Sequence, residues 1–329
     1  MKDYLNSKTY AVSTVCNALM DIIVEATDKD LAHFELEKGR MHLVDEHRQI
    51  EILAYLSNHQ QTVELGGSAM NAIRTLTELG HPTLFAGMVS DDEFGRNILS
   101  RASDLGIKTK LSMGSGGTGT SIILVTPDGE RTMNTYLGAS RLYGGDIIPH
   151  EEIADSKVFH FCGYQWDTDG QKKGINAAIA TAKENGVKIS FDIADPFVVE
   201  HHRQDFIDLI SESADIVFAN ESEAKLLYGT DVQETAKIIA DTGAVAVIKL
   251  GAKGALIRID NETYEVAPVA TNVVDTTAAG DMFAAGFLHG FVLDQTPESC
   301  GKMAATIASD VISRYGAVVS KDVVDQFKI

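Results

Sequence analysis

One short segment of the chain combines residue types that suit phosphoryl transfer. Residues 275–281 read Asp-Thr-Thr-Ala-Ala-Gly-Asp and lead into an apolar stretch, 282–288, that predicts a buried helix. Small residues let backbone N–H groups crowd around an anion, and a helix N-terminus adds about half a positive charge. Asp281 would then lie beside a bound phosphate and could act as a base toward an incoming hydroxyl. The alternative is an ordinary acidic residue near a helix start.

A second segment, residues 66–71, reads Gly-Gly-Ser-Ala-Met-Asn and precedes a predicted helix over 72–79. The paired glycines permit close approach of the backbone to a ligand. Asn71 can both donate to and accept from a hydroxyl group. The alternative is a flexible turn in which Ser68 caps the helix.

Asp21 places a charge inside an otherwise apolar predicted strand. A carboxylate in such a setting needs a polar partner. A vicinal diol would satisfy it, because two hydroxyl donors match the two oxygens of one carboxylate.

Two further polar segments follow predicted strands. Asn220 and Glu223 lie in Asn-Glu-Ser-Glu, at a strand end where open α/β sheets place their ligands. They could organise the water shell of Mg²⁺, and the alternative is a capped, acid-rich helix start. Residues 249–255 read Lys-Leu-Gly-Ala-Lys-Gly-Ala, a strand and glycine turn that could follow a triphosphate or an adenosine group. A plain hairpin is the alternative.

Some motif-like segments carry no site prediction. The glycine-rich stretch 114–119 lacks the Gly-Lys-Ser/Thr ending of a P-loop, and we interpret it as a mobile lid loop. His201 and His202 have no spaced third ligand, so a metal site is not predicted there. No Gly-x-Ser-x-Gly element occurs in a strand-turn-helix context.

The 329-residue chain is strongly acidic, with a formal net charge of −19. Such a surface repels nucleic acid and anionic lipid, so neither class of partner is expected. Charged residues make up 23% and hydrophobic residues 44%, which favours a globular protein over a disordered or fibrous one. The length suits an α/β enzyme with an accessory lid.

The cysteine content and the hydropathy pattern predict the cellular compartment of the protein. Cys16, Cys162 and Cys300 form no Cys-x-x-Cys pair and are odd in number, as expected in a reducing cytoplasm. Structural zinc is therefore not predicted. The apolar stretch 10–24 is broken by polar residues and predicts no signal peptide. No run of about 18 apolar residues predicts a membrane span.

From about residue 150 onward, short apolar segments alternate with helical ones, which predicts repeated strand-helix-strand units. The predicted strands are 158–162, 187–192, 216–219 and 244–250. Apolar residues at helical spacing predict helices at 174–185, 205–212, 221–228 and 232–241. The predicted fold is α/β, with a doubly wound and mostly parallel sheet.

The segment 111–137 departs from this pattern, because two β-rich runs flank a Pro-Asp-Gly turn and predict a hairpin. The hairpin strands are 120–125 and 131–136, and residues 18–26 and 40–44 could join them in a small sheet that covers the site as a lid. We therefore predict a single domain, 1–329, with a lid subdomain formed by about 17–46 and 108–138.

The order of these motifs resembles the ribokinase/PfkB family of small-molecule kinases over nearly the whole chain. Residues 66–71 resemble the first family signature, 275–281 the second, and 220–223 the Asn-x-x-Glu magnesium element. Three signatures in this order are highly specific. The resemblance implies a ribokinase-like fold with ATP and Mg²⁺ as cofactors, and it leaves dependence on a monovalent cation such as K⁺ open.

Weaker marks resemble the adenosine kinase branch of this family. Residues 17–22 look like its entry strand and 191–197 like its central strand and turn, which favours a nucleoside over a free sugar. Two positions depart from the pattern. Ala278 stands where the family most often has glycine, which would strain a left-handed backbone. Tyr164 and Trp166 lie where animal adenosine kinases carry phenylalanines; either could stack on a purine, or Trp166 could belong to the core.

The resemblance assigns roles residue by residue. Asp281 faces the acceptor hydroxyl as base, and the backbone of Ala278, Ala279, Gly280 and Asp281 forms an anion hole. The substrate-binding residues are Asp21, Gly66, Gly67, Ser68, Asn71 and Tyr164, and the ATP-binding residues are Asn220, Lys249, Gly251, Gly254 and Thr276. Glu223 holds Mg²⁺ through water. We interpret Arg131 as an exposed arginine at a turn, with an approach to the phosphates or the substrate as the alternative.

The predicted function is ATP-dependent phosphorylation of a nucleoside 5′-hydroxyl, adenosine to AMP, in purine salvage. The alternative is a sugar kinase of the same family acting on ribose, fructose or 2-keto-3-deoxygluconate. Retention of Asp281, Asn220 and Glu223 disfavours an inactive nucleotide sensor. A nicotinamide-dependent oxidoreductase is disfavoured because its Gly-x-Gly-x-x-Gly turn is missing. The sequence is compatible with a monomer or a homodimer.

Overall fold

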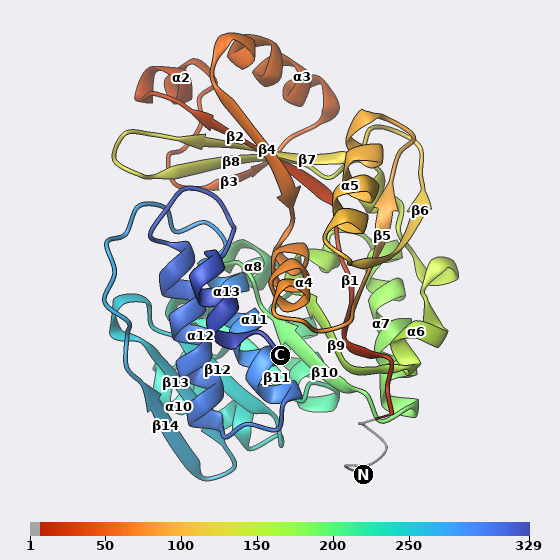
Figure 1. The fold of residues 1–329 in the computed structure, drawn as a ribbon, viewed down its shortest axis with the longest axis vertical. Coiled ribbons are helices and arrows are strands. Elements are labelled where there is room, and N and C mark those ends of the chain that lie inside the picture. The colour runs from red at the N-terminus through yellow and green to blue at the C-terminus, as the bar shows by residue number, and fades with distance from the viewer. Residues whose placement is uncertain (1–6) are drawn as a thin grey trace.

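The computed structural model describes residues 7–329 and contains two β-sheets of unequal size (Figure 1). The large sheet has nine strands in the order β14-β13-β12-β11-β10-β9-β1-β5-β6. Its strands are β1 (Tyr10–Val15), β5 (Thr83–Val89), β6 (Lys108–Met113), β9 (Ser156–Cys162), β10 (Lys188–Asp192), β11 (Ile216–Asn220), β12 (Val245–Lys249), β13 (Ala255–Ile259) and β14 (Glu262–Val266). Neighbouring strands from β12 to β6 pair in parallel, while β13 and β14 form an antiparallel edge.

Helices cover both faces of the large sheet because its strands are apolar on both sides. Along β9, Phe159 and Phe161 pack on one face, whereas Val158 and Cys162 pack on the other. The first face is covered by α7 (Asp169–Glu184), α8 (Pro196–Glu212), α9 (Glu221–Tyr228) and α10 (Val232–Ala240). The second face is covered by α4 (Ser68–Glu78), α5 (Glu93–Asp104), α11 (Ala279–Val292) and α12 (Pro297–Val311). The short helices α6 (His150–Ala154) and α13 (Lys321–Phe327) lie at the periphery.

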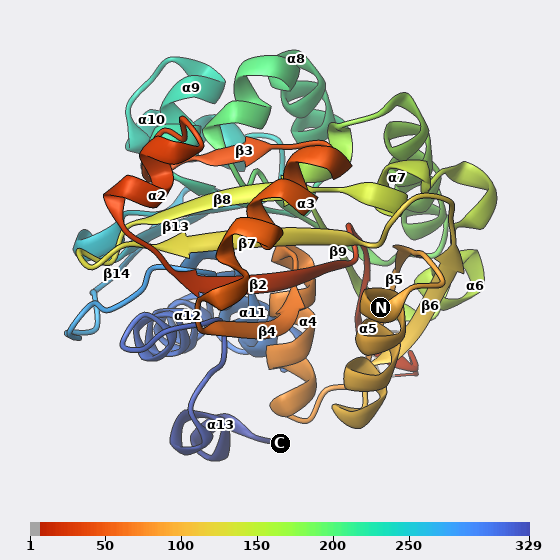
Figure 2. The same cartoon turned by 90° about the horizontal axis from the view of Figure 1, so that it is seen from above.

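The small sheet crosses over the large one and has the order β3-β8-β7-β2-β4 (Figure 2). Its strands are β2 (Leu19–Glu25), β3 (Met41–Leu43), β4 (Gln61–Gly66), β7 (Gly119–Val125) and β8 (Arg131–Tyr136). Helices α2 (Asp28–His33) and α3 (Glu46–Tyr55) cover its outer face. Strand alternation sends Ile22 and Ile122 to that covered face and Asp21 and Ile123 to the opposite one.

Most predicted elements are confirmed within a few residues, including the β7–β8 hairpin and the four parallel strands after residue 150. The small sheet differs from the predicted lid segments in two places. Residues 108–113 form β6 in the large sheet, and β4, which was not predicted, joins the small sheet. The glycine-rich stretch 114–119 connects β6 to β7, so it links the two sheets. None of the helices within residues 7–329 is both long and apolar enough to cross a membrane.

The contact between α11 and α12 positions the start of α11, where residues 275–281 are predicted to bind an anion. Gly286 lies where a Cβ atom would stand 2.6 Å from the Cα atom of Ala304 on α12. We expect Gly286→Ala to lower the free energy of unfolding by about 2 kcal/mol, since overpacking against backbone typically costs about 1–3 kcal/mol. Urea denaturation measures this loss. Gly145→Ala is the control, because a Cβ added at Gly145 would meet no atom within 4 Å; equal effects of the two substitutions would contradict the prediction.

Candidate active site

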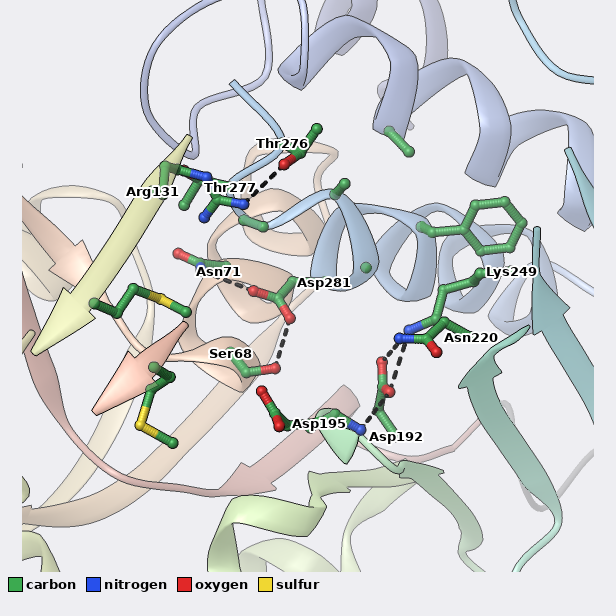
Figure 3. Close-up of a pocket in the computed structure, with 18 of the residues that line it drawn as sticks. Ser68, Asn71, Arg131, Asp192, Asp195, Asn220, Lys249, Thr276, Thr277 and Asp281 are labelled. Atoms are coloured by element: carbon green, nitrogen blue, oxygen red, sulfur yellow. Dashed lines mark hydrogen bonds and ion pairs between the residues drawn. The ribbon is translucent and has the colours of Figure 1, made fainter. Parts of the chain in front are cut away.

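A cavity of about 1140 Å³ lies between the two sheets. Asp192, Asn220 and Lys249 reach it from the carboxyl ends of β10, β11 and β12. Side chains of the small sheet, among them Asp21 and Arg131, line the opposite side. Figure 3 shows the polar side chains converging on the start of α11. The location matches the rule that open α/β sheets bind ligands at strand carboxyl ends.

The N-terminus of α11 has the features of an anion-binding site. Ala278 is its N-cap and provides no side-chain cap. The backbone N–H groups of Ala278, Gly280 and Asp281 donate no hydrogen bond to any residue in the described part of the chain, while the Ala279 N–H donates to the Thr276 carbonyl at 3.3 Å. The first N–H groups of a helix have no intrahelical partner, and these line the cavity, so this turn fits a ligand that supplies acceptor oxygens.

The backbone of this turn is strained. Ala278 has φ 55° and ψ 11°, the left-handed region that costs a non-glycine residue about 1–2 kcal/mol. Residue 278 therefore does require positive φ, and alanine occupies it with strain. At Gly280, a Cβ would lie 3.1 Å from the Nζ atom of Lys249. The lysine ammonium group thus stands beside the anion-binding turn.

Asp281 is held firmly in the first turn of α11. The Ser68 hydroxyl donates to its Oδ1 atom at 2.5 Å, and the Asn71 amide donates to Oδ2 at 2.9 Å (Figure 3). Burial raises the pKa of Asp281 to about 6, although these two hydrogen bonds act in the opposite direction. A carboxylate with a pKa near neutrality suits a general base.

The start of α4 differs from the prediction. The helix begins at Ser68 rather than at residue 72, and Gly67 is the N-cap with φ 95°. The interpretation of Ser68 as a helix cap is therefore wrong, since its hydroxyl binds Asp281. Gly67 also has no room for a side chain, because a Cβ would lie 2.8 Å from the carbonyl oxygen of Asn17.

Asp21 lies on the cavity side of β2 and accepts no hydrogen bond from any residue within 7–329. It is 7% exposed, and burial raises its pKa to about 7, with Asp281 adding to the increase. Gly66 does not line the cavity; a Cβ at this glycine would clash with the Asp21 carboxylate. Asp21 is therefore a buried acid whose partner must come from a ligand.

The ends of β10 to β12 form a second charged group. Lys249 Nζ lies 3.0 Å from the Oδ2 atom of Asp192. Burial by itself lowers the pKa of Lys249, but Asp192 and Glu223 raise it. Asn220 and Glu223 form a capping box, in which the Asn220 N–H and side-chain amide donate to the Glu223 carboxylate at 2.7 and 2.6 Å. The capped-helix interpretation is thus confirmed, and burial raises the pKa of Glu223 to about 7.

Arg131, on β8, connects the small sheet to the loop that precedes α11. Its Nε atom lies 2.8 Å from Asp275 Oδ1, and an Nη atom donates to the Thr276 hydroxyl at 2.9 Å. The arginine side chain is 16% exposed, so its interpretation as an exposed turn residue is wrong. Asp275 also accepts from the N–H groups of Thr277 and Gly316, and so orders the loop before α11.

Of the two aromatic residues that follow β9, Tyr164 faces the cavity and Trp166 lies in the core. Tyr164 lines the cavity and donates to Asp195 Oδ2 at 3.2 Å. Trp166 is 3% exposed and packs against Phe161 and Phe206, which confirms the core alternative. Among the described residues, no group of three His, Cys, Asp or Glu side chains is arranged to hold a metal ion.

The structure brings together most residues that the sequence selected. Those lining the cavity are Asp21, Gly67, Ser68, Asn71, Tyr164, Asn220, Glu223, Lys249, Gly251, Gly254, Thr276, Ala278, Ala279, Gly280 and Asp281. Residues 249–255 nevertheless form a β12–β13 hairpin turn, as the alternative proposed. Sequence reasoning missed Asp192 and Asp275. An acid at the carboxyl end of a parallel strand was the available signal for Asp192.

Chemically, the site offers an anion-binding helix start, an adjacent ammonium group and a buried base. Such a site can hold a phosphoryl group and remove the proton of an alcohol placed beside it, which is the work of a phosphotransferase. The pfkB family carbohydrate kinase model matches residues 49–323. The chain therefore belongs to the pfkB family of carbohydrate kinases.

Individual relatives carry different names. A probable sugar kinase protein from Rhizobium etli CFN 42 has 35% identity and a TM-score of 0.90, over 97% of this chain and 98% of that chain. The adenosine kinase from Sinorhizobium meliloti has 34% identity and a TM-score of 0.89 over the same shares, 97% and 98%. An adenosine kinase from Saccharomyces cerevisiae is 26% identical over 91% of this chain and 94% of its own length.

The raised pKa of Asp21 predicts how its replacement affects stability. Because the folded protein holds the Asp21 proton up to about pH 7, the charge destabilises the fold increasingly as pH rises from about 4 to 7. We expect Asp21→Asn to raise the free energy of unfolding above pH 7 by about 1 to 4 kcal/mol, and to have little effect below pH 4. Urea denaturation across this pH range measures the difference.

Asp310 provides a control of opposite sign. Burial alone would raise its pKa, but hydrogen bonds from Arg314 and Ser320 lower it. Asp310→Asn should therefore destabilise the protein above about pH 4 and lose that effect in acid. If Asp21→Asn were also destabilising at pH 8, Asp21 would not be the unpartnered charge described here.

Proposed function

We propose that this protein is an ATP-dependent kinase that phosphorylates the primary 5′-hydroxyl of a nucleoside, with adenosine as the substrate. The observation that carries the proposal is the pairing of a buried carboxylate, Asp281, with unpaired N–H groups at the same helix start. One group can take the proton of the acceptor while the other stabilises the migrating phosphoryl.

Asp21 supports a substrate with a vicinal diol. Its carboxylate faces the cavity without a protein partner in the described chain, and the two hydroxyls of a ribose would supply two donors. The Asn71 Oδ1 atom is buried and has no hydrogen-bond partner either. A hydroxyl between Asp21 and Asn71 would satisfy both groups.

The cavity wall on the small-sheet side favours a nucleoside over a free sugar. Leu19, Met41, Ile123, Met133 and Leu137 line this wall. A nucleobase has apolar faces that pack against such side chains. A free sugar would instead place hydroxyl groups there without partners, which costs free energy for each one.

The opposite end of the cavity suits ATP. Gly251, Gly254 and Thr276 line it, and Lys249 brings a positive charge beside the turn before Asp281. Magnesium, when bound, would neutralise charge between the phosphates. Glu223 would hold it through water, because Asn220 already occupies one side of each Glu223 oxygen.

In the proposed transfer of the γ-phosphoryl group, one phosphorus–oxygen bond forms and one breaks. The substrate 5′-oxygen forms a bond to the γ-phosphorus, the bond from that phosphorus to the β,γ-bridging oxygen breaks, and ADP leaves with the electron pair. The hydroxyl proton passes to Asp281. Because such transition states are loose, positioning and electrostatic stabilisation by the α11 turn supply most of the acceleration. Closure of the small sheet would exclude water and limit ATP hydrolysis.

A substrate panel tests the proposal. ADP formation is measured with adenosine, inosine, guanosine, ribose and fructose as acceptors, each with ATP and Mg²⁺. We expect kcat/KM for adenosine to exceed that for the free sugars by about 100-fold or more, because the apolar wall leaves sugar hydroxyls unpaired. The likeness to a probable sugar kinase supports the alternative. Preference for ribose or fructose would establish that alternative and refute the nucleoside proposal.

Removal of the base gives a second prediction. Asp281→Asn should lower kcat by about 100-fold or more while KM changes little, in line with general-base contributions. In the wild type, kcat/KM should fall about tenfold per pH unit below about pH 6, since the base must be ionised. The variant should lose that acid limb. Near-normal turnover of Asp281→Asn would exclude the base role, whichever substrate the panel selects.

A further inference from the structure

Two cysteines lie side by side at the carboxyl ends of neighbouring strands. The parallel pairing of β1 with β9 sets Thr14 opposite His160, which places Cys16 opposite Cys162 two residues further on. Their Sγ atoms are 3.8 Å apart. Adjacent strands lie about 4.7–4.9 Å apart, within the separation of about 4.4–6.8 Å between Cα atoms that a disulfide spans. The strand spacing is therefore compatible with a disulfide once the two sulfurs approach each other.

The two thiols differ in access. Cys16 is 4% exposed and lines the cavity, whereas Cys162 is 0% exposed and does not line it. A small reagent in the cavity meets Cys16 first. Cys162 lies next to Cys16, on the side away from the cavity, and provides a second thiol.

Polar contacts also favour Cys16 as the reactive partner. The two sulfurs are in hydrogen-bond contact in which either thiol can donate, and the Cys16 sulfur also accepts from the Gln165 amide at 3.6 Å. The contact with Cys162 lowers the pKa of Cys16, whereas the same contact and burial raise the pKa of Cys162. Thiolate character and access together select oxidation-sensitive cysteines.

We propose that Cys16 and Cys162 form a site of reversible oxidation by peroxide, opening on the substrate cavity. The Cys16 sulfur attacks a peroxide oxygen, the O–O bond breaks, and Cys16 becomes a sulfenic acid as one water leaves. The Cys162 sulfur then attacks the Cys16 sulfur, the S–O bond breaks, and a second water carries away the thiol proton. Two thiols are oxidised to one disulfide, and hydrogen peroxide is reduced to two waters.

The position of Cys16 links this chemistry to the substrate site. The next residue, Asn17, also lines the cavity, and its carbonyl oxygen is packed against Gly67 at the start of α4. A ligand that fills the cavity would therefore block the approach of peroxide to Cys16.

The test measures the covalent state, so its outcome does not depend on the identity of the kinase substrate. Reduced protein is titrated with hydrogen peroxide, and intact mass, free thiols and cross-linked peptides are followed. We expect a loss of about 2 Da, disappearance of two of the three thiols and a Cys16–Cys162 peptide, all reversed by dithiothreitol. Adenosine should slow the reaction several-fold if it binds in the cavity as proposed. The same slowing by ATP alone would equally show access through the cavity.

Matched variants assign the roles. Cys300 is 2% exposed and lies apart against Gly290, so Cys300→Ser should form the cross-link at the wild-type rate. Cys162→Ser should accumulate oxygenated Cys16 without a cross-link, and Cys16→Ser should leave Cys162 reduced. The proposal is overturned if the wild type keeps three free thiols, if it gains about 32 Da as sulfinic acid with no cross-link, or if Cys300 reacts as fast as Cys16.

Discussion

The site depends on a carboxylate held at the start of a helix that we propose also receives an anion. Asp281 and the free N–H groups of Gly280 and Ala278 share one turn, so the proposed base and the proposed phosphoryl site cannot move apart. The Ser68 and Asn71 hydrogen bonds keep the base ionisable despite its burial. Without them, burial would favour the protonated acid, and the helix start would bind an anion beside a group unable to accept a proton.

Acidic residues on both sides of the cavity lower the stability of the folded protein, because their charges are buried. Asp21 and Glu223 have pKa values raised to about 7 by burial, and Asp281 adds to the increase at Asp21. The positive charges that offset them are few. Lys249 is paired with Asp192, and Arg131 is paired with Asp275. Such a concentration of perturbed acids is typical of sites where stability is given up for chemistry.

Sequence reasoning succeeded where short-range physics decides the outcome. Glycine runs, the Pro-Asp-Gly turn and strand-length apolar segments marked the β7–β8 hairpin, the α11 start and the parallel strands. It failed where distant segments meet. Ser68 resembled a helix cap, yet its hydroxyl bonds to an acid 213 positions away. Arg131 resembled a surface residue until the small sheet folded onto the loop containing Asp275. β4 went unrecognised because only its pairing with β2 makes it a strand of the small sheet.

By itself, then, the sequence determined that a small-residue turn would open an apolar helix with an acid in its first turn, since backbone freedom and helix periodicity are local properties. It also determined an α/β architecture through alternating strands and helices. Only the tertiary structure decided which charges meet. It set Asp21 across the cavity from Asp281, placed Lys249 against Gly280, and aligned Cys16 with Cys162. Those distances follow from strand order and register, which couple residues that no local pattern connects.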